Sequence, residues 1–377
     1  MEIRQLREEE LAEAVKLSDL VFRDEEQVSM GEAFPLVFSA GLGQSFGALE
    51  NGKVVSFVGL VPFRIHVGAA PLKVFAIGSV CTHPDGRGKG YAGAILQQVN
   101  RHIRQAGASL LLVSGDRSLY TRIHCYPFGT FRSYELKPEH VGALAAAAGG
   151  KGGPEVRELA PADWFALHEL AAARPVRYEQ SVTELAELIR TQAYASCVKL
   201  EHRTLVAVRD GKPVAFAVLA VPGRLQPKSA PKVIEWAGEA GAFGAILAEA
   251  MNRYSLEQLD LAVSWHETDL QQVLQGVPFQ EERNSGTVQV TDPAVLLAQL
   301  QPYWRATGRP GGSELTATSA PDGSCELRLG ADSVRVSPRE LVSLLFDASP
   351  QLAERLPQPI AELFPIPFPY ASGLNMI

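Results

Sequence analysis

The chain has 377 residues, of which 46% are hydrophobic, 20% charged and 8% aromatic. This composition excludes a disordered chain, a collagen and a small disulfide scaffold, and the length predicts two or three domains. Lys and Arg number 35 against 42 Asp and Glu, so the net charge is −7. Such a chain presents no basic field, and we expect no nucleic-acid partner.

Cysteine and histidine usage predicts a protein without a metal site. The four cysteines, Cys81, Cys125, Cys197 and Cys325, are too far apart for a CxxC motif, and no HExxH motif occurs. Free thiols fit a reducing compartment, and the charged amino terminus has no apolar signal region. No uncharged apolar run reaches about 18 residues, so we expect no membrane span and a cytoplasmic location.

The first 138 residues alternate helix and strand patterns. Apolar residues at helical spacing predict an amphipathic helix over 8–22, and strand-like runs follow at 45–49, 54–65 and 72–81. Asn51-Gly52, between the first two runs, is a strong hairpin signal. The sheet is therefore predicted to be at least partly antiparallel.

The next block repeats this order after a predicted flexible linker. Residues 142–154, rich in Ala and Gly, predict the linker. A helix is expected over 161–173, a hairpin at Asp210-Gly211, and a helix over 241–254 after a strand at 233–237. Because the later helices of both blocks contain Gly-Ala-Ile-Leu, at 93–96 and 244–247, we interpret the second block as a duplicate of the first.

The chain from residue 289 onward has a different pattern. Strands are expected near 288–290 and 325–329, and helices over 292–300 and 338–346, the second with Ser337 as N-cap. The last residues, 364–377, contain too much proline for a regular element and are predicted to be extended.

The most informative motif runs from Gly78 to Asn100. An apolar strand ends near Thr82, and a glycine-rich turn at 87–90 precedes a helix. Glycines at a helix start let an anion approach free backbone N–H groups, and Arg87 and Lys89 add positive charge. The pattern predicts a pyrophosphate site.

Three kinds of nucleotide ligand are candidates for this site, and the residues count against the first two. A Walker A loop needs Ser or Thr after Gly-Lys, but Gly90 follows Lys89, so nucleoside triphosphate chemistry is excluded. Gly88, Gly90 and Gly93 spell GxGxxG, with Asp116 in the place of a ribose ligand, which leaves a dinucleotide site as an alternative. The hairpin-linked strands before the motif disfavour it.

The stretch resembles the acyl-CoA motif of the GNAT superfamily of N-acetyltransferases. Arg87, Gly90 and Ala92 match that motif in order, and the strand Val80-Cys81-Thr82 resembles the one that pairs with pantetheine. The resemblance implies acetyl-CoA as the acyl donor. It also implies a set of cofactor-binding residues: Val80, Cys81, Thr82, Arg87, Gly88, Lys89, Gly90, Tyr91 and Ala92.

The layout of the whole chain resembles the enhanced intracellular survival (Eis-like) acetyltransferases. This implies an α+β protein with two GNAT-like mixed-sheet domains and a sterol carrier protein-like α/β domain. The expected segments are a catalytic domain at 1–145, a degenerate one at 154–288, and the third with an extended tail at 289–377. The resemblance also implies a homo-oligomer such as a hexamer. In the second block Glu239 replaces the cations, so we expect one cofactor per chain.

Two catalytic residues follow from the resemblance. Tyr120 matches the tyrosine near the acetyl-CoA sulfur and would act as general acid, although a packing aromatic is the alternative. The carboxylate of Ile377 would act as base, with a frayed terminus as the alternative. An acyl-cysteine route through Cys81 or Cys125 is less favoured than direct transfer.

The expected activity is transfer of acetyl to a primary amine. Aminoglycosides, polyamines and lysine side chains carry the same ammonium group, and the sequence does not separate them. Residues 24–26, Asp-Glu-Glu, either hold this cation or form a solvated charge run. A non-catalytic acyl-CoA-binding regulator and a lipid-binding protein are the alternative functions.

Overall fold

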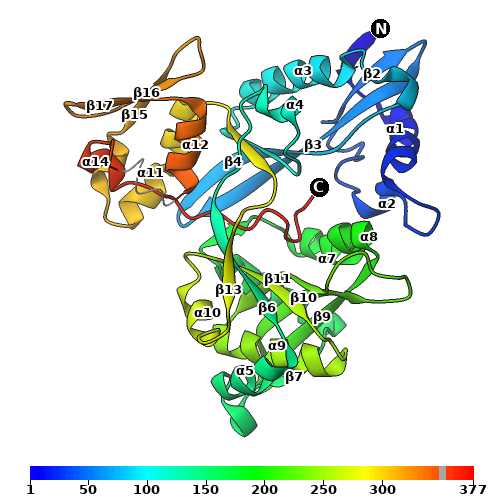
Figure 1. Ribbon diagram of the computed structural model, residues 1–377, viewed down its shortest axis with the longest axis vertical. Coiled ribbons are helices and arrows are strands. Elements are labelled where there is room, and N and C mark those ends of the chain that lie inside the picture. Colours follow the sequence, from blue (N-terminus) through cyan, green and yellow to red (C-terminus); the bar gives the residue numbers. More distant parts are fainter. Residues whose placement is uncertain (348–353) are drawn as a thin grey trace. The chain divides into compact units, whose positions relative to one another are not determined.

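The computed structural model describes residues 1–347 and 354–377 of a mixed α+β protein (Figure 1). Contacts divide the chain into two compact units. The first contains Met1–Gly129, Arg283–Phe368 and Ile377, and the second contains Thr130–Glu282 and Pro369–Met376. The three domains expected from the sequence remain a prediction, because the two units are defined by contacts within the chain and not by domain families.

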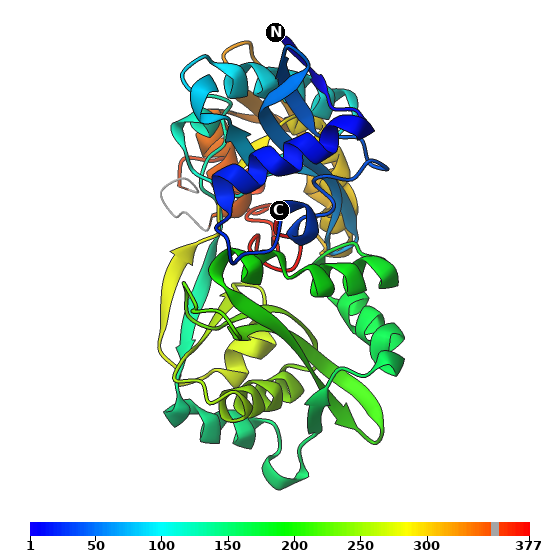
Figure 2. The same cartoon turned by 90° about the vertical axis from the view of Figure 1, so that its right-hand side faces the viewer.

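The first unit is built on a mixed sheet in the order β1-β2-β3-β4-β5-β14. Neighbours are antiparallel except β4 and β5, which are parallel. The strands are β1 (Glu2–Gln5), β2 (Phe46–Glu50), β3 (Lys53–Val67), β4 (Ala70–Thr82), β5 (Leu110–Val113) and β14 (Thr287–Val290). Figure 2 shows helix α1 (Glu8–Phe22), in blue, lying along these strands.

Helix α3 (Tyr91–Gln105) covers the sheet with its apolar face, which includes the buried Ile95, Leu96, Val99 and Ile103. The shorter helical elements of this part are α2 (Met30–Ala33), η1 (Pro84–Gly86) and α4 (Ser118–Thr121). Helix α3 follows β4, after η1 and a turn, and α4 follows β5. Because β4 and β5 are parallel, both helices begin at the same edge of the sheet.

The first unit also contains a small antiparallel sheet of β15 (Thr316–Ser319), β16 (Cys325–Leu329) and β17 (Asp332–Val336). The helical elements beside it are α11 (Pro293–Ala306), η5 (Pro310–Ser313), α12 (Pro338–Phe346) and α14 (Gln358–Ala361). Trp304 of α11 is fully buried and donates from Nε1 to the carbonyl of Leu363 at 3.1 Å. This bond fixes the chain shortly before its carboxyl-terminal tail.

The second unit has a seven-stranded sheet in the order β13-β6-β12-β11-β10-β9-β7. The strands are β6 (Thr130–Leu136), β7 (Glu155–Glu158), β9 (Leu200–Arg209), β10 (Lys212–Pro222), β11 (Lys232–Gly238), β12 (Leu259–Ser264) and β13 (Phe279–Arg283). Its core consists of the inner faces of these strands and helix α9 (Ala240–Arg253). β11 and β12 are parallel.

The remaining elements of the second unit are short. They are η2 (Pro138–His140), α5 (Val141–Ala147), η3 (Gly150–Gly152), η4 (Pro161–Asp163), α6 (Trp164–Ala173), β8 (Val176–Tyr178), α7 (Val182–Thr191), α8 (Ala193–Val198) and α10 (Thr268–Val273).

One order of elements occurs in both units. The series β2-β3-β4-α3-β5-α4 in the first corresponds to β9-β10-β11-α9-β12-α10 in the second. Both hairpins turn at the predicted dipeptides, where Asn51, Gly52, Asp210 and Gly211 all have positive φ. The repeated Gly-Ala-Ile-Leu sequences lie in α3 and α9.

The predicted flexible linker at 142–154 is wrong. Residues Val141–Ala147 form α5, and Leu144 is only 1% exposed, within the core of the second unit. Alanine has the highest helix propensity, and one buried leucine gives the helix a packing face. By contrast, the predicted helices over 8–22 and 338–346 match α1 and α12.

Candidate active site

The candidate site begins where β4 and β5 of the first unit separate. Their parallel pairing ends at Ile77 and Val113, whereas β4 continues to Thr82, paired with β3 alone. Val80, Cys81 and Thr82 therefore lie on a strand edge that β5 does not cover. The pantetheine-binding role expected for these three residues remains a prediction.

A β-bulge lies at the point of separation. On β3, Gly59 pairs with Gly78 and Phe57 with Cys81, so the register shifts between them. Ser79 adopts a φ of 53°, which is uncommon for a residue other than glycine. Its buried hydroxyl has no hydrogen-bond partner among the residues that the structure describes. Our sequence analysis missed Ser79, because no sequence pattern distinguishes a bulge of this kind from a continuous strand.

The carboxyl terminus of the chain lies against this bulge. A Cβ added to Gly78 would lie 2.4 Å from the carboxyl carbon of Ile377 and 2.8 Å from its oxygen. Only glycine permits so close an approach of the terminus to β4. Ile377 itself is 8% exposed, so the chain end is buried here instead of frayed.

The glycine-rich loop leads from β4 into α3 and is open to a ligand. Gly88 and Gly90 have φ of 79° and 81°, and no heavy atom lies within 4 Å of a Cβ built on either. Gly90 is the N-cap of α3, whose first-turn N–H groups lack intrahelical acceptors. These features fit the pyrophosphate of an acyl-CoA substrate.

The two cations of the loop differ in their surroundings. Arg87 is exposed and forms no ion pair with any described residue. Lys89 lies 3.8 Å from the Glu50 carboxylate, which also accepts a hydrogen bond from the Tyr91 hydroxyl. Arg87 is thus available to an anion, whereas Lys89 and Tyr91 anchor the loop to the end of β2. Ala92 follows in the first turn of α3.

Tyr120 and Tyr91 belong to the same hydrophobic cluster, and Val80 packs against this cluster. The side chain lies on α4 and is 6% exposed, and burial raises the pKa of its hydroxyl above the usual value of 10.0. The hydroxyl makes no hydrogen bond to the described part of the chain. It is therefore protonated at neutral pH and able to donate.

The two cysteines near this site have no thiolate character. Burial raises the pKa of Cys81 to about 11 and that of Cys125 to about 12. The Cys81 sulfur lies 3.6 Å from the Ser18 hydroxyl of α1. Because a nucleophilic cysteine needs a lowered pKa, these surroundings disfavour an acyl-cysteine.

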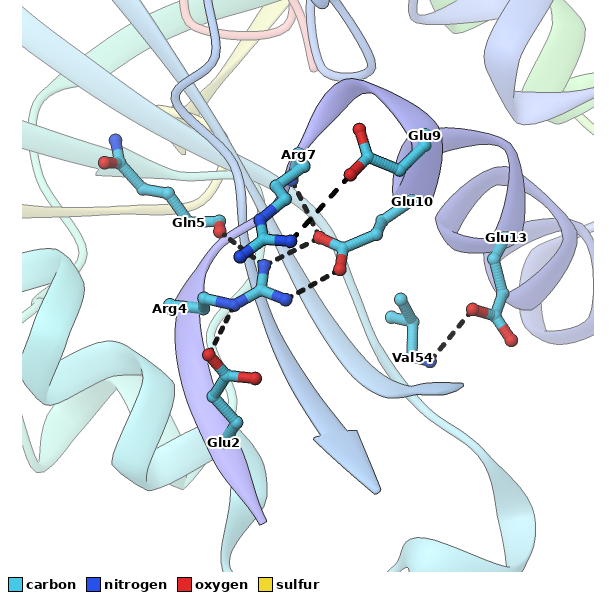
Figure 3. Close-up of polar contacts among 8 residues, drawn as sticks. All are labelled: Glu2, Arg4, Gln5, Arg7, Glu9, Glu10, Glu13 and Val54. Atoms are coloured by element: carbon cyan, nitrogen blue, oxygen red, sulfur yellow. Dashed lines mark hydrogen bonds and ion pairs between the residues drawn. The ribbon is translucent and has the colours of Figure 1, made fainter. Parts of the chain in front are cut away.

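Helix α1 is tied to the sheet at several points (Figure 3). Arg4 of β1 forms two hydrogen bonds of 2.7 Å with the Glu10 carboxylate, and Glu13 accepts from the Val54 N–H at 3.1 Å. The acidic residues after this helix, 24–26, are exposed. The Glu26 N–H donates to the Asp24 carboxylate within this turn.

No group of three or more His, Cys, Asp or Glu side chains in residues 1–347 and 354–377 is placed to hold a metal ion. Within the same ranges, no helix combines the length and the apolar character that crossing a membrane requires.

Comparisons with known proteins identify the domain that carries the site. Residues 2–126 match the acetyltransferase (GNAT) domain family. No curated protein sequence matches the chain. Its structure is similar, over 100% of both chains, to GCN5-related N-acetyltransferases from Kribbella flavida, with 14% identity and a TM-score of 0.65, and from Anabaena variabilis, with 11% and 0.64.

Eis1 from Mycobacterium abscessus is also similar, over 89% of this chain and 85% of its own, with 12% identity and a TM-score of 0.57. At these identities the likeness is one of fold. The family match covers β4, the glycine-rich loop and Tyr120. Residues 2–126 therefore form a GNAT acetyltransferase domain.

Proposed function

We propose that the protein is an acetyl-CoA-dependent N-acetyltransferase that transfers acetyl directly to a primary amine. The observation that carries this proposal is the burial of the chain's terminal carboxyl group against Gly78, at the bulge where β4 leaves β5. A carboxylate at this position adds a basic group beside the uncovered strand edge, in a domain whose family is acetyltransferase. Aminoglycosides, polyamines and lysine side chains are the acceptor classes.

In this proposal, Arg87 and the amino-terminal end of α3 hold the pyrophosphate of acetyl-CoA. Val80, Cys81 and Thr82 offer backbone groups to its pantetheine arm. The pantetheine arm is therefore held mainly by backbone groups of the protein. The Cys81 side chain is not needed for this contact and remains buried beside Ser18. Gly88 and Gly90 leave the space above the loop open.

The proposed chemistry requires a neutral amine and a protonated leaving group. An alkyl ammonium has a pKa of about 10.4, so a base must accept a proton before the nitrogen attacks the thioester carbonyl. The Ile377 carboxylate is that base. As the carbon–nitrogen bond forms and the carbon–sulfur bond breaks, the Tyr120 hydroxyl donates its proton to the departing sulfur. Attack is direct, since both nearby thiols are protonated.

We further propose an Eis-like organisation. The repeated order of elements supports a second, degenerate GNAT-like domain within 154–288, and the separate sheet β15-β16-β17 supports a sterol carrier protein-like domain after 289. A cytoplasmic homo-oligomer such as a hexamer completes the proposal. A non-catalytic acyl-CoA-binding regulator is the main alternative, and lipid binding by the last domain is the second.

Thiol release from acetyl-CoA across a panel of amines tests the activity. Two variants keep the rest of the chain: deletion of Ile377, and extension by one glycine, which moves the carboxylate by about 3.5 Å. We expect the wild type to release thiol with at least one amine class. Both variants should lose turnover while they still bind acetyl-CoA in calorimetry.

The other outcomes separate the alternatives. Binding of acetyl-CoA without thiol release for any amine would favour the regulator. Full turnover in both variants would remove Ile377 as base but keep the enzyme. Absence of acetyl-CoA binding in the wild type would overturn the proposal.

A further inference from the structure

A cleft of about 490 Å³ lies within the second unit. Its residues come from the end of α6, the start of β10 and the turns that follow the parallel strands β11 and β12. Ligands of α/β proteins bind where parallel strands lead into helices, and the volume is that of a small-molecule site.

One wall of the cleft is aromatic and rigid. Trp236 stacks on Phe243 of α9, with ring centroids 4.7 Å apart and an angle of 15°. The Arg174 guanidinium lies 5.4 Å from the centre of the Trp236 ring, so the indole is held in one orientation. Leu170, Val214 and Leu270 extend this apolar surface. The wall would receive the uncharged body of a ligand.

The charge of the lining is negative. It contains one guanidinium, Arg174, and three carboxylates, Glu239, Glu267 and Asp269. Arg174 is already bound by two carboxylates, through one nitrogen to Glu235 and through the other to Glu267 at 2.8 Å. Its charge is therefore neutralised within the protein. At the exposed rim, Glu239 is paired with Arg209 at 2.6 Å, whereas Asp269 forms no ion pair with any described residue.

His266 provides a further polar group in the lining. Its buried Nδ1 has no hydrogen-bond partner in the described chain. Burial lowers the pKa of this imidazole below its usual 6.5, so the ring is neutral at pH 7 and adds no positive charge. A neutral ring nitrogen without a partner can accept a hydrogen bond from an N–H donor.

The equivalent position in the first unit has the opposite charge. There, Arg87-Gly-Lys-Gly90 connects β4 to α3. Between β11 and α9 the chain reads Gly238-Glu239 instead, and Gly238 cannot carry a side chain because a Cβ would lie 2.2 Å from the carbonyl oxygen of Val214. Glu239 is paired there with Arg209, so this turn lacks the unpaired cation that Arg87 supplies in the first unit.

We propose that this cleft of the second unit is a binding site for an organic ammonium ion with an apolar body. The apolar part lies on the Trp236 wall, and the ammonium group faces the carboxylates of Glu239, Glu267 and Asp269 and donates to His266 Nδ1. All the lining residues belong to the second unit. The site is thus additional to the acetyl-transfer site and does not depend on that activity.

Fluorine NMR of the full-length chain labelled with 5-fluorotryptophan tests the proposal. The sequence has four tryptophans, so four signals can be assigned by single Trp→Phe variants. The probes are phenethylamine, 2-phenylethanol and 3-phenylpropionate, which share a phenyl group and differ in charge. We expect the amine to shift the Trp236 signal saturably, with weaker binding of the alcohol and none of the carboxylate.

Two kinds of variant locate the binding. Ala173→Phe places a ring at an exposed lining position and should abolish the Trp236 shift, whereas Ala172→Phe, next to it on α6 and outside the lining, should not. The exposed pair Glu239→Gln and Asp269→Asn should weaken amine binding about fivefold, in line with surface ion pairs. The double variant keeps the test valid if Ala173→Phe does not fold.

Several results would overturn the proposal: no amine-induced shift of Trp236, equal shifts from amine and carboxylate, or an Ala173→Phe variant that binds as the wild type does. A saturable Trp236 shift from acetyl-CoA would also contradict the charge argument. None of these measurements depends on turnover. Failure of amine binding in this cleft can therefore be distinguished from failure of the proposed acetyltransferase activity.

Discussion

Burial of Tyr120 determines the pH range in which it can serve as an acid. Its pKa is raised above 10.0, chiefly by burial, so the hydroxyl stays protonated through neutral and moderately alkaline pH. A general acid loses activity only when pH rises through its own pKa. The limb of the turnover profile that belongs to Tyr120 is therefore expected above pH 10, on the alkaline side.

Replacing Tyr120 with Phe removes the proposed proton donor and little volume. We expect kcat to fall by about 10²-fold or more, with acetyl-CoA affinity nearly unchanged and the alkaline limb absent. Tyr303→Phe is the control, because Tyr303 is also a buried tyrosine of the first unit, at 8% exposed. Steady-state kinetics from pH 6 to 11 check this, and equal kcat values for the two variants would exclude Tyr120 as the acid.

Gly78 positions the chain end. In Gly78→Ala the new Cβ would overlap the Ile377 carboxyl group, so we expect the terminus to leave its place, kcat to fall and carboxypeptidase to release Ile377 faster. Gly93→Ala is the matched control, since nothing lies within 4 Å of a Cβ there. Mass spectrometry follows the release. If both variants released Ile377 at the wild-type rate, the terminus would not depend on Gly78.

An ion pair ties the amino-terminal end of helix α1 to β1. Hydrogen bonds from Arg4 lower the pKa of Glu10 from 4.5 to about 2 (Figure 3). Since the folded state prefers the charged carboxylate, the pair stabilises the protein above pH 4.5, and this stabilisation is lost as pH falls towards 2. The tether thus weakens only in acid.

Glu10→Gln should lower the free energy of unfolding by about 1 kcal/mol at pH 7. The difference from the wild type should shrink as pH falls from 4.5 towards 2, where Glu10 becomes protonated. Urea unfolding at pH 7 and at pH 3 measures both values. Glu9→Gln is the control, because the Glu9 side chain is 70% exposed and its ion pair with Arg7 is long, at 4.0 Å. A difference independent of pH would contradict the assignment.

At the scale of elements, hydrophobic period and turn residues predicted most of what forms. The pattern of α1, the Asn51-Gly52 turn and the Ser337 cap are local signals that tertiary contacts did not override. Helix α5 shows the limit of such signals. Its Ala-rich sequence is compatible with a linker or a helix, and packing of Leu144 in the second unit's core selected the helix.

Across the whole molecule, the duplicated order of elements does not imply two acyl-CoA sites. The loop at Arg87–Gly90 is open and basic, whereas the equivalent turn contains Glu239. The first unit therefore carries the basic loop that we propose binds the pyrophosphate, and the second unit has an acidic residue at the equivalent turn.

Calorimetric titration should give one acetyl-CoA per chain. Arg87→Glu should weaken this binding at least tenfold, as expected for loss and reversal of a charge-assisted contact, a change of about 1.4 kcal/mol or more. Lys53→Glu, at the start of the second strand of the first hairpin, controls for net charge. A stoichiometry of two would show that the second unit also binds the donor.

The sequence by itself determined the strand–loop–helix motif, its glycine-rich basic loop and the repeated order of elements, because each depends on neighbours within about twenty residues. Only the tertiary structure decided which residues distant in the sequence come together. Ile377 reaches Gly78 across 299 residues, the bulge at Ser79 depends on pairing with β3, and the acidic cleft gathers side chains from α6, β11 and the turn after β12. Such contacts are set by packing, which no local pattern encodes.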